Sequence, residues 1–412
     1  MNTPRRTALE LSYNGKNVTA AITDQLESFT YTDVASGETD TLAIVLSEEK
    51  HKWINAWFPV EEDYMEASVQ VKDWNFQGDN RRLKCGKFMV DDFTFNGPPD
   101  VYNLNAISCP IDTDFASTTK SKSWSKTTTK GIASTIAKSA GISLHYDADI
   151  YKIEKLEQSN ETDMTFLFRL CDSYGLAMKI YNSKLVIFSE TAYEKKKAVG
   201  TIDKKDCENY TLNGTLVGKY HGVIMKYTVS KTNKTYTYKY MQSQGKRILK
   251  LNEKADSLAD AEIKAKAKLR KSNKDARTIN LTLKGDIKYI AGTCFNITGF
   301  GKFNGNYYID KAVHTLSGGY TVTLQMHMVD AVSGNSKTTG TTAGKDGQYE
   351  VITQLTGYYT AEEAKSQKSV KKTGKVYPGT YYIYNTSNGM INVTKVKGVP
   401  GSWINPNKNG SG

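Results

Sequence analysis

The spacing of apolar residues changes twice along this chain of 412 residues, and this change most limits the folds it can adopt. Near the N-terminus apolar residues alternate, as in Leu9, Leu11 and Tyr13 before the turn signal Asn14-Gly15. Alternation of this kind is typical of strands with one buried face, and Asn-Gly favours a tight hairpin turn. Similar segments continue to about residue 110, which predicts roughly five to seven short strands in a barrel or sandwich.

The middle of the chain instead has the period of a helix. Ile132 and Ile136 lie about one turn apart, and Gly141 supplies a signal to stop. A second helix is predicted at about residues 162–174, where apolar side chains again share one face. We therefore expect a small α/β domain over residues 116–200.

Strand patterns return beyond residue 200. Residues 320–328 alternate between apolar and polar side chains without a break, and other strand segments precede them. One predicted helix, at residues 256–271, interrupts this block. We therefore expect a second β domain over residues 201–330 with one packed helix.

Beyond residue 330 the composition changes. Ser, Thr, Gly and Lys dominate residues 331–347, as is typical of a flexible linker, and aromatic residues and Gly follow in a short terminal segment. The sequence therefore predicts a first β domain (1–115), an α/β insertion (116–200), a second β domain (201–330), a linker (331–375) and a small C-terminal module (376–412).

Composition and charge exclude several classes of protein. No apolar run approaches the length that spans a membrane, and the N-terminal residues lack the apolar core of a signal peptide. The 55 basic and 43 acidic residues give a net charge of +12, an excess too mild to identify a partner. The five cysteines lie far apart and form no CxxC pair, which predicts reduced, mostly buried thiols of a protein made in a cytosol.

The residue types that most often carry chemistry form no recognised motif. The five histidines show no HExxH pattern and no Cys/His spacing that suits a metal, and no GxSxG elbow is present. His145, Asp147 and Asp149 could form a metal trio, but alternation in an extended segment would place them on one polar face without any function. We therefore predict no catalytic residue, no metal ligand and no cofactor.

Two other patterns imitate functional motifs. The carboxylate pairs Asp91-Asp92 and Asp112/Asp114 could serve as glycosidase acids, which need a fixed separation, but solvated strand ends explain them more simply. Residues 299–302 imitate a phosphate-binding loop but lack its spacing of Gly and Lys. We interpret them as a hairpin turn.

A basic stripe lies on the helix predicted at residues 256–271. Lys264, Lys266, Lys268 and Arg270 could meet phosphates, and a nucleic-acid-binding role would make DNA affinity depend on salt and on these lysines. Acidic residues precede the bases along this helix, however, and that polarity complements the helix dipole without any ligand. The nucleic-acid interpretation therefore ranks last.

Three stretches of the sequence form a familiar set. They are Trp124 and Thr128 followed by residues 132–142; residues 158–176; and, after the basic helix, residues 281–286, 291–292, 299–301 and 305–309 with His314 and Gly319-Tyr320. In this order and spacing they resemble the late-control protein D family, the baseplate hub of contractile phage tails and phage-tail-like bacteriocins. That family is related to the lower part of the type VI secretion spike protein. The match covers about residues 5–330.

The resemblance implies an α+β fold, mainly β, with two tube-protein-like β-barrel domains, an α/β insertion, a linker and a small C-terminal module. It implies a structural protein and no enzyme: a homotrimer whose pseudo-sixfold ring joins the tail tube protein to the spike or needle protein in the virion tail baseplate. Baseplate wedge and other tail proteins are further expected partners. Tape-measure protein and DNA are candidates for passage through the ring, and no membrane insertion is expected.

The sequence departs from the family in two places. Asn160-Glu161-Thr162-Asp163 replaces the usual acidic-Ser-Asp helix start, which is tolerable because Asn and Thr also cap helices. No needle or lysozyme-like domain is evident, so the spike is expected to be a separate protein.

The terminal segment resembles a small module of tail and cell-wall-lytic proteins of phages of Gram-positive bacteria, on the residues Tyr381–Asn385 and Gly401–Pro406. Its aromatic residues either form a minimal core or dock a neighbouring baseplate protein or peptidoglycan. The alternative function is therefore a phage-associated cell-wall hydrolase or peptidoglycan-binding effector, and a zymogram on host cell walls separates the two.

Overall fold

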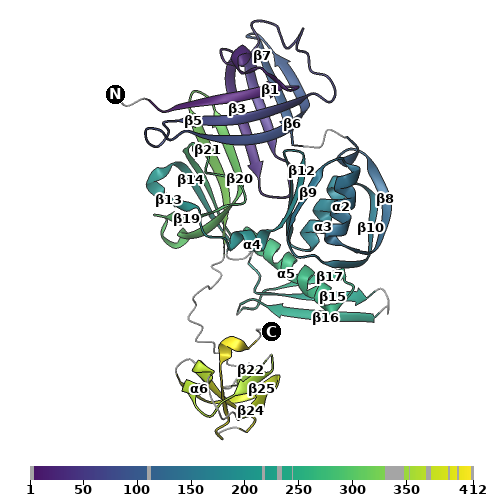
Figure 1. Ribbon diagram of the computed structural model, residues 1–412, viewed down its shortest axis with the longest axis vertical. Coiled ribbons are helices and arrows are strands. Elements are labelled where there is room, and N and C mark those ends of the chain that lie inside the picture. Colours follow the sequence, from purple (N-terminus) through teal and green to yellow (C-terminus); the bar gives the residue numbers. More distant parts are fainter. Residues whose placement is uncertain are drawn as a thin grey trace. The chain divides into compact units, whose positions relative to one another are not determined.

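The protein divides into two compact units, Met1–Asp330 and Ala331–Gly412, in a computed structural model (Figure 1). The structure describes residues 4–108, 113–215, 219–229, 234–243, 245–329, 348–351, 353–367, 373–387, 390–396 and 399–409. Residues 331–347 of the predicted linker lie outside this part, as do Cys109 and Asp112. No helix in the described part is long and apolar enough to cross a membrane.

A sheet of 13 strands dominates the first unit. Its N-terminal strands are β1 (Arg6–Tyr13), β2 (Lys16–Asn17), β3 (Leu26–Val34), β4 (Thr41–Ser47), β5 (Tyr64–Lys72), β6 (Arg81–Asn96) and β7 (Val101–Ile107), with the short helix α1 (Thr19–Ile22). Its later strands are β13 (Gly200–Asp203), β14 (Cys207–Gly214), β18 (Arg277–Lys284), β19 (Cys294–Thr298), β20 (Gly305–Leu316) and β21 (Tyr320–Met328). The prediction of a mainly β fold is confirmed.

The two predicted β segments share one continuous sheet, which the sequence analysis did not foresee. The strand order is β14-β18-β21-β20-β3-β4-β7-β6-β5-β1-β2, and β13 and β19 extend it beside β20. The seam is an antiparallel pairing of β3 with β20, from Phe29 opposite Leu316 to Val34 opposite Lys311. Strand β20 has a bulge between Ile309 and Lys311, and its two halves therefore pair with different neighbours, β19 and β3.

One hydrophobic core continues across this seam. Its buried members from the two segments include Phe29, Tyr31, Ile44, Leu281, Val322 and Leu324. His314 of β20 lies fully buried in it, with Nδ1 2.8 Å from the Tyr320 hydroxyl and Nε2 2.9 Å from the Tyr289 carbonyl oxygen. Burial lowers the pKa of His314 to about 4, so the imidazole is neutral and acts as a satisfied core residue.

The insertion between the two segments contains both helices that the apolar spacing predicts. Its elements are β8 (Thr119–Thr128), α2 (Thr129–Ser139), β9 (Ser143–Asp147), β10 (Lys152–Thr162), α3 (Asp163–Ser173), β11 (Leu176–Tyr181), β12 (Lys184–Ser189) and α4 (Glu190–Glu194). The helices α2 and α3 begin at N-caps Thr128 and Thr162, whose hydroxyls accept hydrogen bonds from Gly131 and Thr165. They pack in one core with Trp124.

Another small sheet lies under the basic helix. Strands β15 (Gly222–Val229), β16 (Lys234–Met241) and β17 (Ile248–Lys254) form it in the order β16-β15-β17, with β16 antiparallel and β17 parallel to β15. Helix α5 (Leu258–Lys274) covers one face, burying Val223 and Met225 against Ala261 and Ala265 (Figure 1).

The second unit has its own core. Its elements are β22 (Gln348–Val351), β23 (Leu355–Gly357), α6 (Ala361–Ser366), β24 (Gly374–Val376), β25 (Gly379–Ser387), β26 (Met390–Thr394) and β27 (Ser402–Ile404). Residues 348–367, which the sequence prediction assigns to the linker, belong to this fold: β22 pairs with β25, and Tyr349 and Val351 are buried with Ile391. The apolar residues that close this core are too widely spaced along the chain to be assigned to it from the sequence.

Because the two β segments share one core, we expect a substitution that shortens a buried side chain there to lower the free energy of unfolding strongly. Leu324→Ala removes a fully buried side chain of β21, and we expect the free energy of unfolding of the first unit to fall by about 2–5 kcal/mol. Gln325→Ala on the same strand is the control: its side chain is exposed, and the expected change is within about 0.5 kcal/mol. Chemical denaturation measures both, and equal effects would contradict a core that spans the seam.

Candidate functional site

His145, Asp147 and Asp149, the residues weighed as a metal trio, do not converge on a site. The Asp147 carboxylate accepts a hydrogen bond of 2.9 Å from the Tyr193 hydroxyl, and the Asp149 carbonyl oxygen accepts one of 3.0 Å from Tyr146. Within the described residues, no group of His, Cys, Asp and Glu has an arrangement that could hold a metal ion.

The other imitations of motifs have structural roles. Asp92 accepts a hydrogen bond from Asn105, and Asp114 accepts one from Thr118. The stretch at residues 299–302 turns the chain between the antiparallel strands β19 and β20, so its interpretation as a hairpin turn is confirmed.

Three cysteines are buried, as predicted. They are Cys85, Cys171 and Cys294. Burial raises the pKa of each thiol above its ordinary value, which disfavours the reactive thiolate.

The basic side of α5 is neutralised within the chain. Its ion pairs are Lys264–Asp260 (2.8 Å), Lys266–Glu262 (2.5 Å), Lys268–Asp172 (2.9 Å), Arg270–Glu190 (2.7 Å), Lys271–Asp172 (2.5 Å) and Lys274–Glu190 (2.8 Å). Two of them are i,i+4 pairs along the helix, and the others reach α3 and α4. The interpretation that these bases need no phosphate ligand is supported.

Where α4, α5 and the large sheet meet, six titratable groups form a junction cluster, of which three are buried and three are half-buried. Its members are Glu190, Glu194, Arg270, Lys274, Asp310 and His327. Lys274 Nζ lies 2.7 Å from Asp310, and Arg270 also pairs with Glu194. The imidazole of His327 lies between the same two carboxylates: Nδ1 is 2.7 Å from Asp310, and Nε2 is 2.8 Å from Glu194. The cluster therefore connects the insertion, the basic helix and the bulge of β20.

Oppositely charged neighbours favour the charged forms of Glu190 and His327 despite their burial. Burial would raise the pKa of Glu190, but Arg270 and Lys274 outweigh it and lower that pKa to about 2. Burial would lower the pKa of His327, but hydrogen bonds to Asp310 and Glu194 raise it above its ordinary value. Removing one partner would therefore leave an uncompensated charge in the interior.

A second buried ion pair joins the insertion to the seam strand β3. Lys179 Nζ of β11 lies 2.7 Å from Asp33 and 3.1 Å from Asp40. Burial raises the pKa of Asp40 to about 6, although Lys179 acts in the opposite direction. Asp33 also accepts a hydrogen bond of 2.8 Å from the Ala291 backbone, so one carboxylate ties three segments together.

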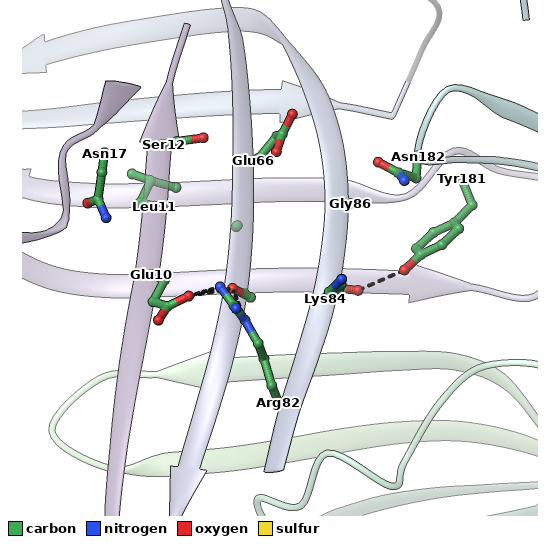
Figure 2. Close-up of a pocket in the computed structure, with 12 residues that line it drawn as sticks. Glu10, Leu11, Ser12, Asn17, Glu66, Arg82, Lys84, Gly86, Tyr181 and Asn182 are labelled. Carbon is green, nitrogen blue, oxygen red and sulfur yellow. Dashed lines mark hydrogen bonds and ion pairs between the residues drawn. The ribbon is translucent and has the colours of Figure 1, made fainter. Parts of the chain in front are cut away.

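A polar cleft of about 370 Å³ lies on the outer face of β1, β5 and β6, and the β11–β12 turn borders it beside β6 (Figure 2). Glu10 and Arg82 form an ion pair on its floor, and the Tyr181 hydroxyl donates a hydrogen bond of 2.9 Å to the Lys84 carbonyl oxygen at its wall. Glu66 and Lys84 are exposed at the cleft. The cleft offers charges of both signs, which suits contact with a polar segment.

The sequence analysis missed the junction cluster. Its members come from four separate elements, and only Arg270 had drawn attention. The signal that could have found them is weak: Glu190 and Glu194 lie one turn apart on a short helix, and His327 is one of several polar residues in an alternating strand.

The junction cluster predicts unequal costs for two basic residues of α5. Arg270→Met leaves Glu190 and Glu194 buried without their main partner, and we expect the free energy of unfolding to fall by about 3–5 kcal/mol. Lys266→Met removes an exposed pair with Glu262, and we expect a loss below about 1 kcal/mol. Denaturant unfolding of both variants measures the difference; similar losses would refute the structural role of the cluster.

The lowered pKa of Glu190 predicts a loss of stability in acid. The folded chain keeps this carboxylate ionised to about pH 2, whereas its ordinary pKa is 4.5. Its contribution is therefore complete above pH 4.5 and disappears as the pH falls toward 2, a change on the order of 3 kcal/mol. The free energies of unfolding of the wild type and of Glu190→Gln should converge over this interval. A difference that stays constant with pH would contradict the assignment.

Comparisons with known proteins agree with the resemblance found in the sequence. No family model matches the chain. It is 29% identical to the probable baseplate hub protein of Escherichia phage 186 over 236 residues, and 29% identical to that of Escherichia phage P2 over 234 residues. These matches cover 55% and 54% of this chain and 57% of each relative, so the chain spans little more than half the length of the curated relatives it matches.

Solved structures share the fold. A tail protein from Neisseria meningitidis MC58 has a TM-score of 0.59 at 13% identity, covering 78% of this chain and 96% of that one. The 43 kDa tail protein of prophage MuSo2 from Shewanella oneidensis has a TM-score of 0.59 at 11% identity, covering 78% and 98%. An Escherichia coli component of the type VI secretion system has a TM-score of 0.50 at 10% identity, covering 78% and 77%. The chain is similar in sequence to phage baseplate hub proteins and in fold to tail proteins.

Proposed function

We propose that this protein is a structural hub of the baseplate of a contractile phage tail or tail-like particle. Three copies form a pseudo-sixfold ring that joins the tail tube to the spike, and the protein has no catalytic role. The similarity to two curated baseplate hub proteins carries this proposal. The fold shared with tail proteins supports it, because it extends over 78% of the chain.

The continuous sheet supports a ring physically. The N-terminal β segment contributes the hairpin β3–β4 to the seam, and the later β segment contributes the hairpin β20–β21. One protomer therefore holds two β segments side by side in one sheet. At the two ends of the sheet, β14 and the Arg6–Glu10 part of β1 each have a strand neighbour on one side only within the described residues. Two different free edges can pair head to tail between protomers, and such contacts close into a ring when the rotation fits.

The buried charges support a mechanical role. The junction cluster and the Lys179 pair fix the insertion and the basic helix to the sheet at several points. A hub that holds the tube and releases or guides the spike during contraction needs such a rigid body with large interfaces. The tail tube protein, the spike or needle protein, wedge proteins and other tail proteins are the proposed partners, with the virion baseplate as location. Passage of tape-measure protein and DNA through the ring is part of the proposal.

The ring predicts an assembly of defined size. We expect the full chain, co-expressed with its proposed tail tube and spike partners, to form trimers with threefold symmetry in electron micrographs. Light scattering after size exclusion gives the mass. A proline at Thr7 of the free edge of β1 should reduce trimer formation, because the backbone N–H of Thr7 points away from β5 and proline cannot donate to a new strand pairing.

The control for the edge variant is Thr235→Pro on β16, an edge outside the large sheet, which should leave the trimer intact. Well-folded monomers in the presence of both partners would contradict the hub role. Trimers that form equally well with either proline would retain the ring but exclude the β1 edge.

A further inference from the structure

The small sheet β15–β17 has one covered face and one exposed face, and the exposed face is strongly basic. The strand register places Lys239 and Lys250 on either side of Ile224, and Lys226 and Lys254 in the next two rows. All four lysines are exposed. Among the described residues of these strands, no Asp or Glu points to this side, because Glu253 alternates to the face that α5 covers.

These four lysines differ from the other bases around them. Each of the bases Lys264, Lys266, Lys268 and Arg270 on α5 has a carboxylate partner within the chain. No ion pair joins any lysine of the exposed face to a carboxylate in the described part of the chain. Neighbouring strands lie about 4.8 Å apart, so the lysines repel one another within about one Debye length. In the folded chain, no carboxylate of the described residues offsets this repulsion between the lysines.

An apolar spot borders the lysines. Met241 and Ile248 flank Gly222 in the first row of the sheet, and Ile224 follows it on the same face. Met241 lies over Gly222, where a Cβ would come within 2.6 Å of its sulfur, and 42% of Met241 is exposed. The face thus has an apolar end beside a set of charges of one sign.

We infer that this face, defined as the basic face by Lys226, Lys239, Lys250 and Lys254, docks an acidic protein surface that presents Asp and Glu beside an apolar side chain. Charge complementarity selects the carboxylates, and the Met241 spot selects the apolar neighbour. A nucleic acid fits less well. The described face has no arginine for bidentate phosphate contacts and no aromatic side chain on which bases could stack. The inference does not depend on the proposed hub role.

The test uses the full chain and three probes: a random copolymer of glutamate and tyrosine, poly-glutamate, and a short DNA duplex. We expect the wild type to bind the copolymer more tightly than poly-glutamate, because only the copolymer offers apolar groups. The variant Lys226→Gln/Lys239→Gln/Lys250→Gln/Lys254→Gln should bind the copolymer about tenfold more weakly or worse. Fluorescence anisotropy measures the affinities, and circular dichroism checks that the variant is folded.

The matched control removes the same charge elsewhere. Lys16→Gln/Lys72→Gln/Lys152→Gln/Lys184→Gln replaces four exposed lysines of other surfaces, and we expect its copolymer affinity to stay within about twofold of the wild type. Equal losses in the two variants would overturn the inference, since net charge alone would then explain binding. A duplex affinity that falls as far as the copolymer affinity in the first variant would overturn it in favour of a nucleic-acid surface. Failure of the wild type to bind the copolymer would also overturn it.

Discussion

The pairing of β3 with β20 is the contact on which the rest of the first unit depends. It joins strands that the whole insertion separates in sequence, and it turns two β segments into one sheet with one core. Neither segment could bury its seam residues alone: Tyr31 of β3 stacks against His314 of β20, and both are buried. The bulge of β20 next to the seam also places Asp310 within reach of Lys274, so the same strand that joins the sheets anchors the basic helix.

Charged residues are distributed in two distinct ways around this sheet. In the interior they are matched, as Arg270 is with Glu190 and as Lys179 is with Asp33 and Asp40. A matched buried set adds little net stability compared with apolar residues, but it penalises every misaligned arrangement, since a shifted partner leaves a buried charge alone. We infer that these sets fix the orientation of the insertion on the sheet. On the basic face charges of one sign are left unmatched, an arrangement that favours an external partner over internal stability.

Local patterns made much of the fold predictable, and long-range contacts did not. Helices α2 and α3 follow from their apolar spacing and threonine caps, because both signals depend on residues near in sequence. The seam, the junction cluster and the membership of Tyr349 in the terminal unit depend on partners distant in sequence, and no local signal encodes them. The basic helix illustrates the limit. Its polarity suggested that no ligand was needed, but only the structure places Glu190 and Asp172 beside its bases.

Helix α5 contacts both the small sheet that carries the basic face and the junction cluster. One side of it packs on the small sheet through Ala261 and Ala265, and its basic residues reach α3, α4 and the bulge of β20. A chain of direct contacts therefore leads from the small sheet through α5 to the junction cluster and to β20, the strand that forms the seam.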